Sequence, residues 1–222
     1  MDFERARFNM IEQQIRPWGV LDPEILELLA VVRREDFVPP EYRSLAFTDM
    51  EVPLTVDGRP TGERMFPPRV EARLLQELAV RKHESALEIG TGSGYLTALL
   101  AHRARQVESF EIQPELAAQA RARLAEAGLG AVVVHVADGS NPAAISAQFD
   151  VIVLAGGVYE VPSWLLERLN PGGRLAAIVG SEPVMRATLY TRDAAGGLAV
   201  RMLFETVTQP LRGFAARSAF QF

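Results

Sequence analysis

From residue 85 onward, short apolar runs alternate with stripes of apolar residues at helical spacing. Such runs as VVVHV and VIVLA are almost continuously apolar, as strands buried on both faces require. This alternation predicts a parallel sheet with crossover helices. The expected strands cover residues 86–89, 107–112, 131–137, 150–155 and 174–179, and the expected helices begin near Ser93, at Pro114, near Asn141 and at Pro162.

The pattern changes in the last part of the chain. Residues 186–191 and 198–206 are two further strand-like runs, and Asp-Ala-Ala-Gly-Gly at 193–197 supplies the turn between them. We therefore expect an antiparallel hairpin added to the sheet. The predicted fold class is α/β: a Rossmann-like, mainly parallel seven-stranded sheet with helices on both faces, a C-terminal antiparallel hairpin and an N-terminal helical cap.

The cap is predicted from the first third of the chain. Apolar residues at helical spacing favour a helix over residues 3–16, which ends where proline follows Arg16. A second helix begins at Asp22, a capping residue followed by proline at the first helical position. Residues 40–68 show no sustained period, and we interpret them as an irregular lid or linker.

A helical stripe returns at residues 70–80 and leads into the first strand of the sheet. At this length, one α/β domain fits better than two half-sized ones. We expect a single domain over residues 1–222, in which 1–68 form the helical cap and lid segment and 69–222 form the Rossmann-like core.

The composition excludes several classes of protein. The 222 residues are 48% hydrophobic and 23% charged, and a formal net charge of −5 gives no general basic field for nucleic acid. The absence of cysteine excludes disulfides, thiolate metal sites and a cysteine nucleophile, and it fits a reducing cytosol. The opening segment MDFERARFNMIEQQIRP is neither a signal peptide nor a membrane span. We expect a cytoplasmic protein with no metal, nucleic-acid or membrane partner.

A glycine-rich turn carries the candidate chemistry. The strand ALEIG runs into Gly90-Thr91-Gly92-Ser93-Gly94 and then into a helix, so the glycines lie at the carboxyl end of the first parallel strand. Ligands of open α/β sheets bind there, against a turn that exposes unpaired N–H groups. Glu111 ends the next strand at about the spacing of an acidic residue that binds ribose hydroxyls.

The spacing of the glycines indicates which ligand this is. A dinucleotide fingerprint reads G-x-G-x-x-G, whereas this turn reads G-x-G-x-G with Tyr95 in the dinucleotide's third position. Glu88 would repel a pyrophosphate but suits a cationic amino-acid group. S-adenosylmethionine carries an ammonium and a sulfonium, so charge favours it over NAD. A P-loop is excluded because no G-K-[S/T] follows.

The third strand adds an acidic residue at its end. Asp138 is followed by Gly139 and is placed to accept a hydrogen bond from an adenine amino group. Two other interpretations stay open: a tight strand-to-helix turn without a ligand, and an NAD-dependent oxidoreductase. The predicted cofactor-binding residues are Glu88, Gly90, Thr91, Gly92, Ser93, Gly94, Glu111, Ile112, Asp138 and Gly139.

Two sets of residues resemble one known family, the protein-L-isoaspartate O-methyltransferases. The amino-terminal pattern MIEQQIR at 10–16, GVLD at 19–22, VVRREDFVP at 31–39 and AFTD at 46–49 is similar to that of the family almost in register. LEIGTGSGY at 87–95 resembles its cofactor motif. The cofactor motif is shared by many methyltransferases, whereas the amino-terminal pattern is specific to this family. Together the resemblance covers about residues 8–180.

The resemblance implies an S-adenosyl-L-methionine-dependent carboxyl O-methyltransferase that takes part in protein repair. Its partner would be a protein or peptide with isoaspartyl residues, whose carboxylate becomes a methyl ester, and the enzyme would be a monomer or homodimer. A carboxylate is already ionised at pH 7, so the reaction needs no strong general base. The enzyme has to align the reacting atoms and exclude water.

One loop departs from the family pattern. Members usually carry Gly-Gln-Thr-Ile-Ser-Gln-Pro before the glycine motif, and the register set by Ala72 and Arg73 places this loop on residues 62–68. Arg64 then occupies the threonine position and Phe66 the position of the catalytic serine. Neither side chain supplies a hydroxyl, so the catalytic residues are unknown.

Three alternatives are compatible with this loop. Arg64 could grip the acceptor carboxylate with two hydrogen bonds. Alternatively, the pocket binds a different acceptor, which stacks on Phe66 and Tyr159. The third alternative is a non-catalytic paralogue that binds the cofactor without efficient methyl transfer.

Overall fold

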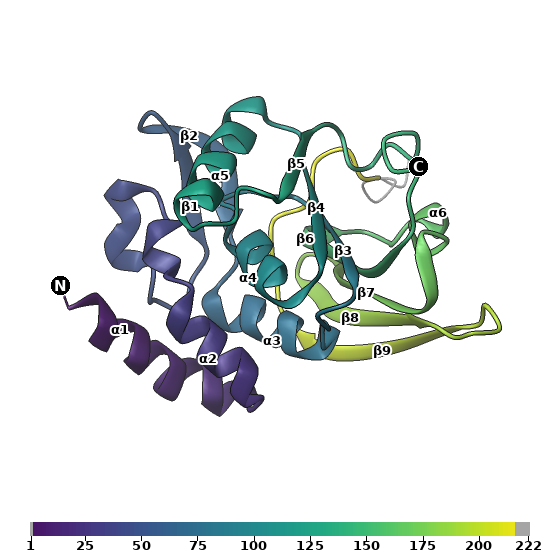
Figure 1. Ribbon diagram of the computed structural model, residues 1–222, viewed down its shortest axis with the longest axis horizontal. Coiled ribbons are helices and arrows are strands. Elements are labelled where there is room, and N and C mark those ends of the chain that lie inside the picture. Colours follow the sequence, from purple (N-terminus) through teal and green to yellow (C-terminus); the bar gives the residue numbers. More distant parts are fainter. Residues whose placement is uncertain (1, 216–222) are drawn as a thin grey trace.

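A seven-stranded sheet organises the computed structural model, which describes residues 2–215 (Figure 1). Its order is β5-β4-β3-β6-β7-β8-β9; β3 to β7 are parallel, and β8 and β9 run antiparallel to their neighbours. The Rossmann-like arrangement and the C-terminal hairpin are thus confirmed. The strands are β3 (Ser85–Ile89), β4 (Gln106–Glu111), β5 (Val133–Val136), β6 (Phe149–Val158), β7 (Leu169–Ser181), β8 (Val184–Arg192) and β9 (Leu198–Glu205).

The central strands separate two hydrophobic cores. Val151 and Val153 of β6 face one core, and the alternating residues Ile152 and Leu154 face the other, because successive side chains of a strand point to opposite faces. All four side chains are fully buried. A strand with a core on each face must be apolar at every position, which explains the continuous run VIVLA.

Helices cover the two faces unequally. Helices α3 (Pro68–Leu78), α4 (Tyr95–Arg103) and α5 (Pro114–Glu126) contribute to the first core, whereas the second receives the short helix α6 (Ser163–Leu166). The helix expected near Asn141 is wrong. Asn141 instead accepts hydrogen bonds from the backbone of Ala143 and Ala144, which closes a turn, and buried Ile145 then fixes the chain before β6.

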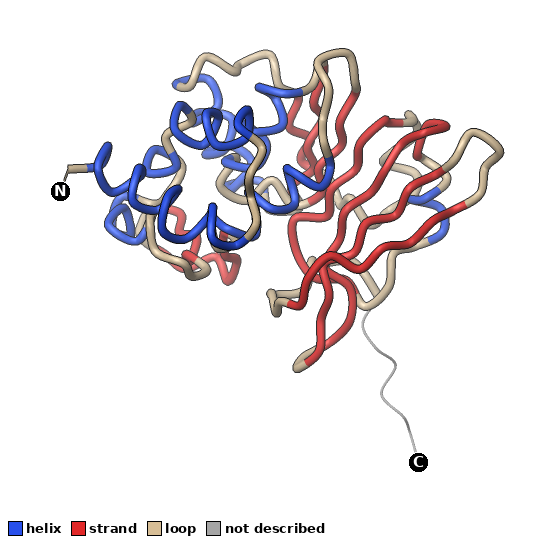
Figure 2. Tube along the Cα trace, turned by 90° about the horizontal axis from the view of Figure 1, so that it is seen from below, coloured by secondary structure: helices blue, strands red, loops and turns tan. Residues whose placement is uncertain are grey.

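The N-terminal cap consists of helices, as expected. Helix α1 (Phe3–Met10) continues into a π-helical turn (Ile11–Ile15), and α2 (Pro23–Val31) begins at Asp22, whose side chain accepts a hydrogen bond from the backbone N–H of Glu24. Short 3-10 turns follow at Arg16–Trp18, Arg34–Asp36 and Pro40–Leu45. In Figure 1 the cap lies at the end of the molecule opposite the tip of the β8–β9 hairpin, and Figure 2 shows its helices beside the sheet.

The stretch expected to be irregular holds a second, separate sheet. Strands β1 (Val52–Val56) and β2 (Arg59–Met65) form a two-stranded antiparallel hairpin within residues 40–68. Pro53 and Pro60 lie within these strands. Proline cannot donate a hydrogen bond to a neighbouring strand and argues against a strand assignment, so this stretch carries no clear strand signal. The lid segment is therefore an ordered hairpin.

After β9 the chain crosses back over the carboxyl ends of the central strands. We call residues 206–215 the C-terminal strap. The backbone N–H of Gly157 donates to the carbonyl of Gln209 at 2.8 Å, and the N–H of Leu211 donates to the carbonyl of Gly157 at 2.8 Å. These two bonds attach the strap to the end of β6. Within residues 2–215, no helix is both long and apolar enough to cross a membrane.

Candidate active site

The glycine turn between β3 and α4 adopts a conformation that requires glycine. Gly90 has φ +97° and Gly92 has φ +52°, the left-handed region in which a Cβ is strained. The N–H of Gly90 donates to the carbonyl of Phe110 at 2.8 Å, which fixes the turn to β4. A Cβ at Gly90 would also lie 2.8 Å from Cδ2 of Leu211 in the strap. The turn therefore leaves just enough room for the strap above it.

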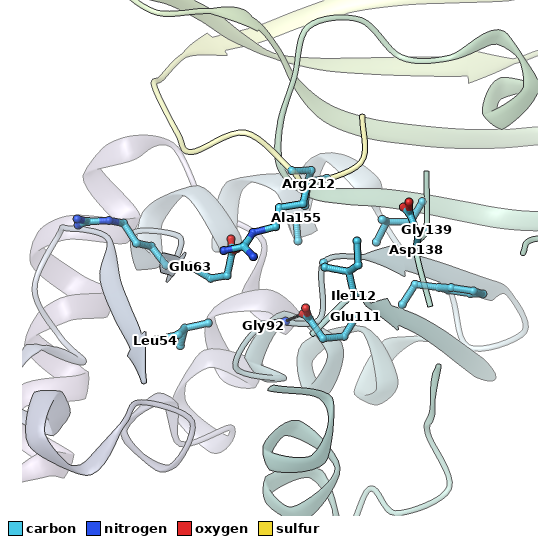
Figure 3. Close-up of a pocket in the computed structure, with 14 residues that line it drawn as sticks. Leu54, Glu63, Gly92, Glu111, Ile112, Asp138, Gly139, Ala155 and Arg212 are labelled. Carbon is cyan, nitrogen blue, oxygen red and sulfur yellow. Dashed lines mark hydrogen bonds and ion pairs between the residues drawn. The ribbon is translucent and has the colours of Figure 1, made fainter. Parts of the chain in front are cut away.

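Two pockets meet at this turn. The outer pocket, drawn in Figure 3, is lined by Leu54, Glu63, Arg64, Ile89, Gly90, Gly92, Phe110, Glu111, Ile112, Asp138, Gly139, Ala155, Leu211 and Arg212. The inner pocket is lined by Arg64, Met65, Phe66, Glu71, Glu88, Gly90, Thr91, Gly92, Ser93, Leu96 and Ala155. They share Arg64, Gly90, Gly92 and Ala155, so they form two adjoining parts of one site.

Glu111 lies in the outer pocket at the end of β4. Its Oε2 accepts a hydrogen bond from the N–H of Gly92 at 2.8 Å, and its Oε1 accepts one from the N–H of Gln113 at 3.0 Å. Burial raises the pKa of Glu111, and the hydrogen bonds from the backbone oppose this shift. The carboxylate thus fixes the glycine turn while it also faces the pocket.

Asp138 and Gly139 form the far side of the outer pocket, with Ile112 (Figure 3). Oδ1 of Asp138 accepts hydrogen bonds from the backbone N–H and the hydroxyl of Ser140, at 2.9 and 2.7 Å. A Cβ at Gly139 would lie 2.6 Å from Cγ2 of Ile89, so only glycine allows the chain to pass this close to β3.

Glu88 lies in the inner pocket and is fully buried. Its Oε2 accepts hydrogen bonds from the hydroxyls of Thr97 and Ser109. Its Oε1 is buried without a hydrogen-bond partner in the described part of the chain. Burial raises the pKa of Glu88 to about 8, although the two hydroxyls oppose the shift. A buried carboxyl oxygen without a partner is unusual and calls for a ligand.

Of the remaining predicted residues, some line the inner pocket, and one instead supports the packing of the turn against a helix. Thr91 and Ser93 line the inner pocket; the hydroxyl of Thr91 is hydrogen-bonded to Ser109 at 2.6 Å, and that of Ser93 accepts from the N–H of Tyr95 at 3.2 Å. Gly94 lines neither pocket and instead packs against α5, where a Cβ would lie 3.4 Å from Ala120. Nine of the ten predicted residues thus line the two pockets.

The opposite wall of the site was not predicted. Leu54 and Glu63 of the hairpin and Arg212 of the strap lie across the outer pocket from the glycine turn (Figure 3). Leu211 of the strap lines the same pocket and lies next to Gly90. No local pattern marks these residues, because they are far apart in the sequence. Only the register of the family loop, at residues 62–68, draws attention to one part of this wall.

Glu63 connects the hairpin to the strap and to the sheet. Its carboxylate pairs with Nε of Arg212 at 2.5 Å and accepts hydrogen bonds from the side-chain amides of Gln113 at 3.0 Å and Gln209 at 3.3 Å. Arg212 also donates to the carbonyl of Thr61 at 3.0 Å. The outer pocket is thus closed on this side by polar side-chain contacts.

Arg64 and Phe66 occupy the loop positions where the sequence departs from the family pattern. Arg64 is exposed, lines both pockets and has no ion-pair partner within residues 2–215. Phe66 is buried and lines the inner pocket. Tyr159 lines a different cavity, formed by the strap and the β7–β8 turn. Phe66 and Tyr159 therefore do not form one stacking platform.

Comparison with known proteins supports one family. The family model described as protein-L-isoaspartate(D-aspartate) O-methyltransferase matches residues 5–213. A protein-L-isoaspartate O-methyltransferase of Koribacter versatilis is 36% identical over 95% of this chain and 92% of its own length. Another, from Anaeromyxobacter sp., is 39% identical over 87% of this chain and 78% of its own length.

Solved structures show the same fold. A protein-L-isoaspartate O-methyltransferase superposes with a TM-score of 0.78 at 24% identity, over 93% of this chain and 66% of that one. A beta-aspartate methyltransferase from Plasmodium falciparum, in complex with S-adenosyl-L-homocysteine, gives a TM-score of 0.76 at 17% identity over 96% and 99% of the two chains. The chain belongs to the protein-L-isoaspartate(D-aspartate) O-methyltransferase family of S-adenosylmethionine-dependent methyltransferases.

Proposed function

We propose that the two adjoining pockets hold S-adenosylmethionine, with the adenosine in the outer pocket and the amino-acid end in the inner one. The acidic side chains support this division. Glu111 would accept hydrogen bonds from the ribose and Asp138 from the adenine amino group, while Glu88 has an unpartnered oxygen for a cationic group. The shared residues Gly90 and Gly92 lie where the two halves of the cofactor would join.

We further propose that the acceptor is the carboxylate of an isoaspartyl residue in a protein or peptide. The observation that carries this proposal is Arg64, an exposed guanidinium that lines both pockets without an ion-pair partner in the described chain. A guanidinium can hold a carboxylate through two parallel hydrogen bonds. It would therefore replace the lost loop hydroxyls as the group that positions the acceptor.

The methyl transfer requires few further groups from the protein. The cofactor supplies an activated methyl group, and the acceptor carboxylate is already ionised near neutral pH, so no side chain has to remove a proton. Arg64 would orient the acceptor oxygen, and the hairpin and strap would keep water out of the pockets. The product is a methyl ester of the isoaspartyl carboxylate, the first step of protein repair.

Residues 1–68 would serve this reaction as cap and lid, and 69–222 as the cofactor-binding core of a single methyltransferase domain. The first hydrophobic core supports a single domain, because it contains Met10 and Ile25 of the cap together with Val151 of the sheet. We propose that the protein acts in the cytoplasm, as a monomer or homodimer, without a nucleic-acid or membrane partner.

A second candidate is methyl transfer to a different acceptor. It is favoured by Phe66, whose buried side chain brings an aromatic ring to the inner pocket where the family usually has a serine. An apolar ring there would suit an acceptor with a flat or apolar group next to the reacting atom.

The test is transfer of a labelled methyl group from S-adenosylmethionine to an isoaspartyl peptide and to its normal aspartyl twin. The wild-type protein should label the isoaspartyl peptide selectively. Arg64→Ala should lower kcat/KM by about tenfold to a hundredfold, the effect of losing a charged hydrogen bond, with unchanged cofactor affinity. The control Arg59→Ala, which removes a highly exposed arginine from the same hairpin, should leave the rate unchanged.

Cofactor binding without labelling of the isoaspartyl peptide would contradict the proposed acceptor. Turnover with another acceptor in the same assay would establish the second candidate. An Arg64→Ala rate equal to that of Arg59→Ala would remove Arg64 from acceptor binding.

A further inference from the structure

A second buried carboxyl lies beside Glu88 in the inner pocket. Glu71, from the first turn of α3, is only 3% exposed and lines the same pocket. The negative charges of Glu71 and Glu111 add to burial in raising the pKa of Glu88, so both carboxyls lie within electrostatic reach of Glu88. Like charges gathered in a buried pocket are costly unless a cation joins them.

Arg34 compensates only part of this charge. Its guanidinium is fully buried, pairs with Oε2 of Glu71 and donates to the carbonyls of Ala46 at 2.9 Å and Phe66 at 2.7 Å. All three of its nitrogens are thus used within the protein. The other oxygen of Glu71, Oε1, has no hydrogen-bond partner within residues 2–215. Arg34 therefore holds Glu71 in place through one oxygen and leaves the second for another donor.

The pocket has two such oxygens, since Oε1 of Glu88 also lacks a partner. The charged and titratable groups placed around the two carboxyls come from four elements. Arg34 follows α2, Tyr95 begins α4, and Glu111 ends β4, while Arg64 lies on β2 at the exposed mouth of the pocket. Arg34 is the one buried cation among these groups, and it is already committed to Glu71. The inner pocket is therefore short of positive charge.

We propose that Glu71 is a second cofactor-binding carboxylate, which together with Glu88 receives the α-ammonium group at the amino-acid end of S-adenosylmethionine. This inference rests on the proposed placement of the cofactor and adds a residue to it. An ammonium has three donors, and two of them would satisfy Oε1 of Glu88 and Oε1 of Glu71. Ligands that lack the amino-acid end would gain nothing from either carboxylate.

The test compares two ligands that differ in that end. S-adenosylhomocysteine retains the ammonium, whereas 5′-methylthioadenosine has a methyl group in place of the whole amino-acid part. Calorimetry should show that Glu71→Gln weakens S-adenosylhomocysteine binding by roughly tenfold to a hundredfold, with little change for 5′-methylthioadenosine. The control Glu77→Gln removes a carboxylate from the same helix that pairs with Arg73 and Arg201 outside the pocket, and both affinities should stay at the wild-type level.

A measurement on the wild-type protein decides the question if Glu71→Gln does not fold. Burial raises the pKa of Glu71 to about 7 and that of Glu88 to about 8, so both carboxyls are partly protonated near pH 7. An ammonium between them favours their ionised forms. Calorimetry in two buffers of different ionisation enthalpy should therefore show more protons released with S-adenosylhomocysteine than with 5′-methylthioadenosine.

Equal loss of affinity for both ligands in Glu71→Gln, or no loss for either, would overturn the role of Glu71. Equal proton release with both ligands would do the same. Failure of the wild-type protein to bind either ligand would instead contradict the proposed cofactor site itself, so the two proposals can fail separately.

Discussion

The two walls of the outer pocket are built in different ways. The sheet wall, formed by residues at the ends of β3, β4 and β5, is held by parallel backbone pairing and by a hydrophobic core on each face. The lid wall consists of the β1–β2 hairpin and the strap, which the Glu63–Arg212 ion pair joins. It reaches the sheet through the hydrogen bond from Gln113 to Glu63 and two backbone bonds at Gly157. In the proposed arrangement, cofactor recognition would rest on the rigid wall, and closure on the weaker one.

This difference explains why the departure from the family pattern lies where it does. Arg64 and Phe66 are both on or next to β2, so they belong to the lid wall. Under the proposed function, substitutions there would change what the site presents to the acceptor without disturbing the turn at Gly90 or the carboxylate of Glu111. The fold and the cofactor site can therefore persist while the acceptor side varies.

The largest effect is expected in the sheet wall, from Gly90→Ala. The added Cβ is strained at φ +97° and lies 2.8 Å from Leu211, so the turn and the strap cannot both keep their positions. Affinity for S-adenosylhomocysteine should fall by about a hundredfold, since the strain alone is on the order of 1–3 kcal/mol. Calorimetry with the purified variant measures this.

Gly58→Ala is the matched control, because Gly58 has φ +72° in the β1–β2 turn but nothing within 4 Å of the added Cβ. It should cost some stability and leave the affinity almost unchanged. If both variants bound equally well, the rigid turn would not be essential to the sheet wall.

A smaller effect is expected from Glu88→Gln, on the pH dependence of stability. The folded pKa of about 8 lies above the ordinary value of 4.5, so between these values the folded state binds more protons than the unfolded state. Stability of the cofactor-free protein should therefore fall as the pH rises from 5 to 8. The unfolding midpoint should decrease by about 5 °C, and the decrease should be smaller in Glu88→Gln.

Thermal unfolding by circular dichroism at several pH values measures this change. The part of the decrease that persists in Glu88→Gln is attributed to Glu71 and Glu111, whose pKa values are also raised by burial. A wild-type midpoint that rises between pH 5 and 8 would argue against a buried, protonated Glu88.

The smallest effect is expected in the lid wall, from Glu63→Gln. Arg212 is about half exposed, and an ion pair of this kind is worth roughly 0.2–1 kcal/mol. The rate at which S-adenosylhomocysteine dissociates should increase about two- to fivefold, as measured by stopped-flow fluorescence. Asp57→Asn, which changes a highly exposed carboxylate in the β1–β2 turn, is the control and should leave this rate unchanged. A rate unaffected by Glu63→Gln would mean that the strap does not retain the cofactor.

Much of the sheet wall could be predicted from the sequence because its signals are local. Each strand is a continuous apolar run, and the glycines and acidic residues follow the strand ends directly. Glu88, Glu111 and Asp138 therefore came together as parallel topology requires. The double role of Glu111, which also accepts the N–H of Gly92, depends on side-chain geometry that a sequence pattern does not contain.

A lid segment over residues 40–68 was expected, but its two strands and the strap were not predicted, because they depend on contacts between distant segments. Prolines within β1 and β2 obscured the strand pattern of the hairpin. The strap shows no periodic pattern in the sequence, because its conformation depends on its pairing with Gly157. The role proposed for Glu71 was missed for a similar reason: in the sequence it is one more charge on an amphipathic helix. Only the packing of α3 beside Arg34 and Glu88 brings it into the pocket.

The most direct test of the account is a crystal structure of the protein with S-adenosylhomocysteine. We expect the adenine beside Asp138, the ribose hydroxyls on Glu111 and the ammonium within hydrogen-bond distance of Glu88 in the inner pocket. A ligand bound elsewhere, or bound in the reverse orientation with its amino-acid end beside Asp138, would contradict the division of the site into an adenosine pocket and an amino-acid pocket.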